Sequence, residues 1–254
     1  MRILVTNDDG IHAPGLALLE RIARRFSDDV WVIAPSEEQS GTGHSLTLTR
    51  PVRLRQLGDK RYAVTGTPTD CVMMAVGHVM KDQMPDLILS GINRGGNLAE
   101  DMTYSGTVSA AMEGALAGIR SIALSQQYAR ESAADNVSFA AAESWAENVL
   151  RPLLDTPFDH RTLVNINFPP VDADQVHGVR VVRQGFRDYG RLQFVKGIDP
   201  RGYDYFWFGL GEMIHTPMQD TDLEAIADHF ISVTPVQLDL THYEALDQLR
   251  ALYR

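Results

Sequence analysis

Short apolar runs recur along the first half of the chain, and segments with a helical pattern separate them. The runs lack the polar alternation of a strand with one wet face, which indicates strands covered on both sides. They are ILV (3–5), VWVIAP (30–35), DLILSG (86–91) and SIALS (121–125). Between them, GLALLERIARRF (15–26) and SGTVSAAMEGALAG (105–118) carry apolar residues at helical spacing. This alternation predicts a mostly parallel sheet with helices on both faces.

One segment interrupts the alternation. Residues 46–66, LTLTRPVRLRQLGDKRYAVTG, predict an antiparallel excursion with a turn near Gly58. Thr67 then resembles a helix N-cap, with Asp70 completing a capping box, and this helix is expected to run to about Lys81. The fold class that follows is α/β, a Rossmann-like three-layer αβα arrangement.

The second half predicts fewer elements. SFAAAESWAENVLRPLL (138–154) has a helical pattern, and TLVNINFPP (162–170) is typical of a strand. VRVVRQGF (179–186) and YDYFWFGLG (203–211) are β-like and aromatic, which favours core or subunit contact over a ligand platform. We expect one domain, 1–254, made of a core over about 1–170, a β-rich extension over about 175–235 and a C-terminal helix over about 241–254.

Composition indicates which binding partners and which cell compartment are expected. The chain has 33 acidic and 23 basic residues and a formal charge of -10, which argues against nucleic acid polymers but not against small anions. Cys71 is the single cysteine, so an intrachain disulfide is excluded and a reducing compartment is favoured. Its apolar flanks predict a buried helix residue. Without a signal peptide, or an apolar stretch near the roughly 20 residues of a membrane span, we expect a cytoplasmic protein with no membrane contact.

Two adjacent carboxylates, Asp8 and Asp9, follow the first strand. Like charges side by side destabilise each other unless a cation, a proton or solvent relieves them. A plain turn is the alternative, because Asn, Asp and Gly are common turn residues. Polar, glycine-rich loops also follow two further strands, and in such sheets ligands bind beyond the carboxyl ends of the strands. These loops are APSEEQSGTGHS (34–45) and SGINRGGNLAEDMTYSGTVS (90–109).

Several site classes are excluded by spacing. NDDGIHAPG (7–15) lacks the G-x-G-x-x-G of a dinucleotide site, and the chain holds no G-x-x-x-x-G-K-[ST] phosphate loop. A receiver domain would need a phosphoacceptor Asp after a middle strand, which LILSGIN does not supply. Haloacid-dehalogenase phosphatases need Asp-x-Asp, and Asp8-Asp9-Gly10 does not have that spacing. Oxygen donors without His or Cys remain, and these suit Mg²⁺ or Mn²⁺.

Six fragments together resemble the survival protein SurE family of metal-dependent nucleoside monophosphate phosphatases. The resemblance covers nearly the whole chain, with the fragments in the same order as in the family. Any one fragment is weak evidence for the family, but six in register are specific evidence for it. They are ILVTNDDGIHAPG, APSEEQSGTGHSLT, GTPTDCV, DLILSGINRGGN, YSGTVSAAMEGALAGIRSIALS and TDLEAIADHFISVTPVQLDLT.

The resemblance implies one divalent cation, Mg²⁺, Mn²⁺ or similar, in each subunit. In the family the ligands are the two consecutive Asp residues, a Ser of the second-strand loop and the first Asn of S-G-x-N. Here these positions are Asp8, Asp9, Ser40 and Asn93, and Asp8, Asp9 and Asn93 are also the expected catalytic residues. Ser40 taken alone is more typical of a turn residue than of a ligand.

A second group is expected to bind the substrate phosphate. Ser105, Gly106 and Thr107 stand at a helix start, where backbone N–H groups and the helix dipole favour an anion. The alternative for Ser105 is a plain N-cap. Asn97 is placed to reach the phosphate or the metal's waters. His44 is a candidate general acid, but a lone loop histidine is more often solvated or structural, so it stays outside the catalytic set.

Two positions depart from the family pattern. Ala99 replaces a usual glycine, which puts a left-handed backbone there in doubt. Glu37 stands where a basic residue is common and removes a phosphate-steering charge. Neither position is an expected metal ligand. We therefore expect catalysis that is slower or differently selective, and not a complete loss of activity.

The predicted function is hydrolysis of nucleoside 5′-monophosphates to nucleoside and phosphate. The resemblance also implies activity on 3′-monophosphates and, in some members, on short polyphosphate. The alternative is a non-catalytic regulator that binds metal and nucleotide. The resemblance also implies arm exchange between subunits through about 179–210, which is expected to give a homodimer or homotetramer.

Overall fold

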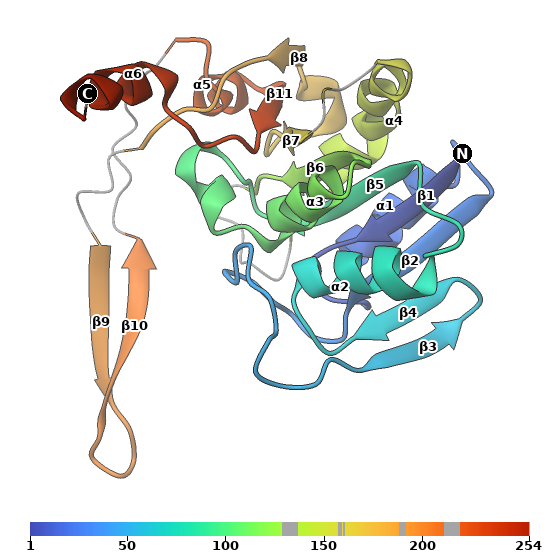
Figure 1. The fold of residues 1–254 in the computed structure, drawn as a ribbon, viewed down its shortest axis with the longest axis horizontal. Coiled ribbons are helices and arrows are strands. Elements are labelled where there is room, and N and C mark those ends of the chain that lie inside the picture. The colour runs from blue at the N-terminus through green and yellow to red at the C-terminus, as the bar shows by residue number, and fades with distance from the viewer. Residues whose placement is uncertain (129–136, 157–158, 160, 188–191, 211–218, 254) are drawn as a thin grey trace.

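The computed structural model describes residues 1–253 apart from 129–136, 157–158, 160, 188–191 and 211–218 (Figure 1). Within this part of the chain, one large sheet holds nine strands, and a separate hairpin holds two. The sheet consists of β1 (Arg2–Thr6), β2 (Asp29–Pro35), β3 (Leu54–Gly58), β4 (Arg61–Val64), β5 (Leu87–Arg94), β6 (Arg120–Gln126), β7 (Thr162–Phe168), β8 (Gly178–Val181) and β11 (Phe230–Gln237).

The described helices flank this sheet or follow it. The longer α-helices are α1 (Pro14–Ala23), α2 (Pro68–Met74), α3 (Gly106–Leu116), α4 (Ala140–Asp155) and α6 (Tyr243–Leu252). Shorter turns are α5 (Asp222–Ala227), a π-helical turn η1 (Ala75–Val79) and the 3₁₀ turns η2 (Ala99–Thr103) and η3 (Ala173–Gln175).

The centre of the sheet is parallel, as predicted. The strand order is β3-β4-β2-β1-β5-β6-β7-β11-β8. The central strands β2, β1, β5, β6 and β7, adjacent in that order, pair in parallel with one another. The excursion is confirmed: β3 and β4 form an antiparallel pair, and β4 lies parallel to β2. At the other edge β11 runs antiparallel to β7, and β8 runs parallel to β11.

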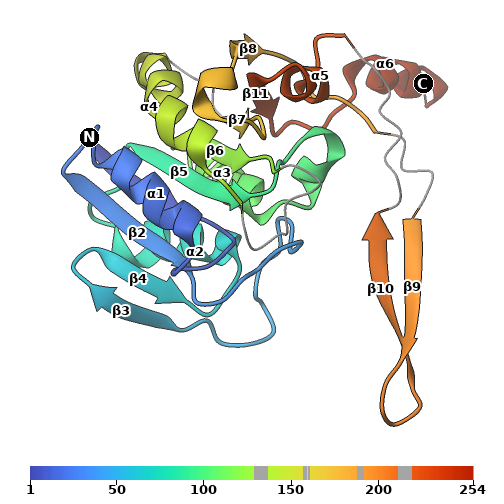
Figure 2. The same ribbon diagram turned by 180° about the vertical axis from the view of Figure 1, so that it is seen from behind.

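Helices cover both faces of the sheet, which confirms the three-layer arrangement. Figure 1 looks onto the face with α2 and α3, and Figure 2 onto the face with α1 and α4. Successive residues of β1 point to opposite layers: Ile3 and Val5 join the core under α1 and α4, whereas Leu4 joins the core under α2. A strand buried on both faces therefore has no polar side.

The capping box at α2 is also confirmed. The Asp70 N–H donates to the Thr67 hydroxyl over 3.1 Å, and the Thr67 N–H donates to Asp70 Oδ2 over 2.8 Å. The helix continues as the π-helical turn η1, so it ends near the predicted residue, Lys81. Cys71 is fully buried in α2, as its apolar flanks predicted.

The C-terminal region divides between the main sheet and a projecting hairpin. The predicted extension contributes β8 and β11 to the main sheet, so that sheet continues beyond the expected core boundary near residue 170. The strands β9 (Leu192–Ile198) and β10 (Asp204–Leu210) form a hairpin that projects away from the body (Figure 1). The terminal helix, α6, is present. Residues 188–191 of the expected arm and Arg254 lie outside the described residues.

In the part of the chain that the structure describes, no helix combines the length and the hydropathy needed to cross a bilayer.

Candidate active site

Three polar loops meet at the carboxyl edge of the parallel strands. Asp8 and Asp9 leave β1 there, and one hydrogen bond ties each of them to a neighbouring loop. The Gln39 N–H donates to the Asp8 carbonyl over 2.8 Å, and the Arg94 N–H donates to Asp9 Oδ2 over 3.1 Å. The loops that carry Ser40 and Asn93 are therefore bound to the acidic pair through the residues beside them.

Asp8 lies under the start of α3 and is only 4 % exposed. The Thr107 hydroxyl donates to Asp8 Oδ1. Burial raises the pKa of Asp8 to about 7 against the lowering effect of the Thr107 hydrogen bonds, and the negative charge of Asp9 adds to the rise. A Cβ added at Gly106 would lie 2.7 Å from the Asp8 Cβ, so only glycine lets the helix come this close.

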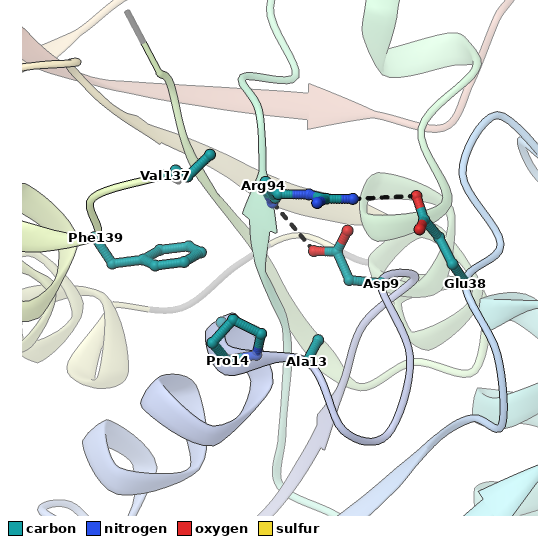
Figure 3. A pocket seen from close by; sticks show the side chains of 8 residues that line it. Asp9, Ala13, Pro14, Glu38, Arg94, Val137 and Phe139 are labelled. Carbon is teal, nitrogen blue, oxygen red and sulfur yellow. Dashed lines mark hydrogen bonds and ion pairs between the residues drawn. The ribbon is translucent and has the colours of Figure 1, made fainter. Parts of the chain in front are cut away.

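Asp9 lines a pocket together with residues at the start of α1 and just before α4. Burial raises its pKa, the Arg94 N–H and guanidinium lower it, and the charge of Glu38 raises it again. The Arg94 guanidinium pairs with Glu38 Oε1 at 3.4 Å (Figure 3). Arg94 therefore places a positive charge beside the acidic pair. Glu37, which stands where a basic residue is common, is exposed and supplies no such charge.

Ser40 and Asn93 are each held in a defined local geometry. The Ser40 hydroxyl donates to Glu38 Oε1 over 2.8 Å. The Asn93 side-chain nitrogen donates to the Gly95 carbonyl over 2.8 Å. Asn93 uses its nitrogen within its own loop, so its amide oxygen is the atom that it can offer to a cation.

The chemistry of these donors fits a hard divalent cation. Asp8 and Asp9 carry carboxylates, Ser40 carries a hydroxyl and Asn93 carries an amide oxygen, the ligand types that Mg²⁺ and Mn²⁺ prefer. Among the described residues, no group of three or more His, Cys, Asp or Glu side chains forms a metal cluster. The expected ligand set contains only two such side chains, Asp8 and Asp9, so it does not form a group of that kind. A cation here would also relieve the like charges of buried Asp8 and half-buried Asp9.

The start of α3 differs in one respect from the expected anion site. Ser105 is the N-cap, and its hydroxyl accepts from the Val108 N–H over 3.1 Å. Both the hydroxyl and the N–H of Thr107 interact with the Asp8 carboxylate. The chain's own carboxylate thus occupies part of the helix N-terminus. These contacts leave the Gly106 N–H as the first-turn donor that can face a substrate.

Asn97 is built into the sheet edge by residues that the sequence analysis missed. Its side-chain nitrogen donates to the Ser125 hydroxyl over 2.8 Å, and its N–H donates to Asn167 Oδ1 over 2.8 Å. Its carbonyl accepts from the side chains of Asn165 and Asn167. Two asparagines in the buried run TLVNINF were the available signal, since a buried strand holds polar side chains only where partners exist.

Ala99 adopts the left-handed backbone that was in doubt, with φ +53°. Its N–H donates over 2.8 Å to Oδ2 of the fully buried Asp222, which also accepts from the Gly185 N–H over 2.8 Å. These bonds offset the roughly 1–2 kcal/mol that a left-handed L-residue costs.

His44 lies against α3 rather than in a free position. Its Nε2 is 3.0 Å from Glu113 Oε2, and both side chains are partly exposed. This pair gives His44 a local structural partner, consistent with leaving it outside the catalytic set.

Fold and site together define a class: a three-layer α/β protein with an acidic pair at the carboxyl edge of its parallel sheet. The model of the family described as survival protein SurE matches residues 3–191, and the chain belongs to that family. The resemblance found in the motifs is thereby confirmed.

Similar proteins extend over the whole chain. A protein of Rhizorhabdus wittichii described as 5′-nucleotidase SurE is 65 % identical over 254 residues, all of both chains. One of Erythrobacter litoralis with the same description is 64 % identical over 246 residues, 97 % of each chain. The crystal structure of the SurE protein from Aquifex aeolicus has a TM-score of 0.85 and 38 % identity and covers 100 % of both chains.

Proposed function

We propose that this protein is a metal-dependent 5′-nucleotidase that hydrolyses nucleoside 5′-monophosphates to nucleoside and phosphate. The observation that carries the proposal is the acidic pair of buried Asp8 and half-buried Asp9, which meets the two other polar loops at the sheet edge. The relatives described as 5′-nucleotidases, 65 % and 64 % identical over nearly the whole chain, support the same activity.

The proposed metal ligands are Asp8, Asp9, Ser40 and Asn93. When bound, Mg²⁺ or Mn²⁺ supplies positive charge that polarises the phosphoryl group and lowers the pKa of a water molecule. Thr107 holds the Asp8 carboxylate in place through its hydroxyl, a role outside the expected phosphate contact.

The proposed phosphate site is the start of α3. Ser105, Gly106 and Thr107 supply the helix terminus, whose dipole favours an anion, and the Gly106 N–H is the donor that the chain's own contacts leave available. Asn97 supports this site by fixing the loop from the sheet edge. Nucleoside 3′-monophosphates and short polyphosphate are further proposed substrates because they present the same phosphoryl group.

The test is phosphate release from AMP, GMP and 3′-AMP with Mn²⁺ or Mg²⁺, against the same reactions in a chelator. We expect release that depends on the cation. Tight AMP binding without release under any of these metals would instead identify a non-catalytic nucleotide-binding regulator.

We also propose a homodimer or homotetramer built through the β9–β10 hairpin. Apolar side chains stand exposed on it, including Trp207 at 69 % and Phe208 at 81 %. Such a surface on a projecting hairpin is stabilised when a second copy covers it. A cytoplasmic location is supported by the single, buried Cys71.

A further inference from the structure

A pocket of about 300 Å³ opens beside Asp9, and none of the residues that line it belongs to α3 (Figure 3). Phe139, Val137 and Pro14 form an apolar wall, and Asp9, Glu38 and Arg94 form a charged one. The two walls come from different elements. The start of α1 and the residues just before α4 supply the first, and the loops after β1 and β2 and the end of β5 supply the second.

The ring of Phe139 is held in position at the apolar wall. Phe139 is the residue just before α4 and packs, partly buried, against the core under α1. A Cβ added at Gly15 would lie 3.3 Å from Phe139 Cζ and 2.0 Å from the Ile92 carbonyl oxygen. Only glycine therefore lets α1 begin this close to β5 and to the ring. The ring is a fixed surface directed into the pocket (Figure 3).

The polarity of the pocket matches that of a nucleoside monophosphate lying across it. The phosphate belongs between the cation proposed at the acidic pair and the start of α3, which lies against Asp8. The flat apolar base belongs at the far wall. Ligand pockets begin at roughly 300 Å³, so the volume admits a nucleoside. A phosphate ester without a base would leave the aromatic wall uncovered.

We propose that this pocket binds the nucleoside of the substrate and that Phe139 stacks on the base. The inference rests on the proposed nucleotidase function. The Arg94–Glu38 ion pair bounds the opposite side and presents hydrogen-bonding groups to the sugar. Glu38 also accepts from Ser40, a proposed metal ligand, so the test uses the apolar wall, where a substitution leaves that contact intact.

Tyr104 is the competing aromatic side chain. It is 63 % exposed and directly precedes the N-cap of α3, the helix whose start lies against Asp8. Unlike Phe139, it does not line the pocket. Selective loss of nucleotide binding on replacing Tyr104 would move the base to the α3 side.

The experiment compares Phe139→Leu with wild type on AMP and on ribose 5-phosphate, at saturating Mn²⁺. Leucine keeps the apolar packing and removes the flat ring. Base–aromatic stacking predicts a fall in kcat/KM for AMP of about fivefold to a hundredfold, mainly through KM. Ribose 5-phosphate, which lacks the base, should react within about twofold of wild type, since it forfeits no stacking.

Phe26→Leu is the matched control. Phe26 is also a partly buried phenylalanine against the same core, but it lies outside the pocket. Val137→Trp is the second variant, because Val137 is half-buried at the pocket and the larger side chain fills it without altering the core. It should reproduce the selective loss on AMP, and it serves as the test if Phe139→Leu does not fold.

Equilibrium binding of adenosine to the metal-free protein supplies a readout that does not need turnover. Phe139→Leu should weaken it by the same factor, and Phe26→Leu should not. An equal loss on AMP and ribose 5-phosphate, unchanged AMP kinetics and adenosine binding, or selective loss only in Tyr104→Leu would each overturn the pocket assignment. If wild type releases no phosphate, the nucleotidase proposal fails, and adenosine binding still decides the pocket.

Discussion

Thr107→Val removes one hydroxyl from the candidate site and almost nothing else. The threonine is fully buried, and its hydroxyl donates to the Asp8 carboxylate. A hydrogen bond to a charged group contributes about 1.5–3 kcal/mol. If that bond holds Asp8 as a metal ligand, its loss should weaken Mn²⁺ binding by about tenfold to a hundredfold, the range typical of residues that orient a ligand.

Calorimetric titration of Mn²⁺ into wild type, Thr107→Val and Thr107→Ser measures the effect. Serine keeps the hydroxyl and loses only a methyl group, so its metal affinity should stay within about threefold of wild type, a free-energy change of about 0.6 kcal/mol. Circular dichroism and thermal unfolding check that each variant is folded.

Two results would refute the reasoning. Equal metal affinity in Thr107→Val and wild type would show that Asp8 does not depend on this hydroxyl as a ligand. An unchanged metal affinity with a raised KM for AMP would place the Thr107 hydroxyl on the phosphate, at the helix start where the sequence predicted a phosphate site.

Three further outcomes are expected. Asp9→Asn keeps the shape but removes one charge, so Mn²⁺ binding should fall and phosphate release should drop about a thousandfold; a folded variant unchanged in both would restore the turn interpretation. At Asp70, burial acts to raise the pKa, but hydrogen bonds from Thr47 and Thr67 outweigh it and hold the pKa below its ordinary 3.8. The carboxylate therefore stabilises the fold above that pH and less as pH falls through the lowered value. Asp70→Asn should cost about 1 kcal/mol in urea unfolding at pH 7, with a gap to wild type that closes below 3.8; a pH-independent gap would contradict this. Light scattering at micromolar concentration should give a dimer or larger, and a monomer would exclude the hairpin interface.

Local patterns were enough to predict most of the fold. The apolar runs of the parallel strands, the helical stripe of α1 and the capping box at Thr67 are set by residues close together in sequence. The same alternation places Asp8 and Asp9 at the carboxyl edge, because a parallel sheet aligns all its strand ends. Motif order along the chain was likewise enough to identify the family.

The order of the outer strands was not available in this way. The chain after β7 reads as an extension, yet β8 and β11 pair at the edge of the main sheet, while β9 and β10 form a hairpin apart from it. Strand pairing between distant segments depends on which edge is open and on which apolar surfaces meet there, and neither is encoded in the pattern of one strand.

The candidate site was also predicted only in part from the sequence. Sequence by itself determined the residue types, two carboxylates beside neutral oxygens, and the edge where they gather. Only the tertiary structure decided that Thr107 holds Asp8, that Asn165 and Asn167 anchor Asn97, and that Phe139 closes a pocket beside Asp9. The physical reason is distance along the chain: Thr107 and Asp8 are 99 residues apart, and a hydrogen bond forms only when packing brings such groups within about 3 Å.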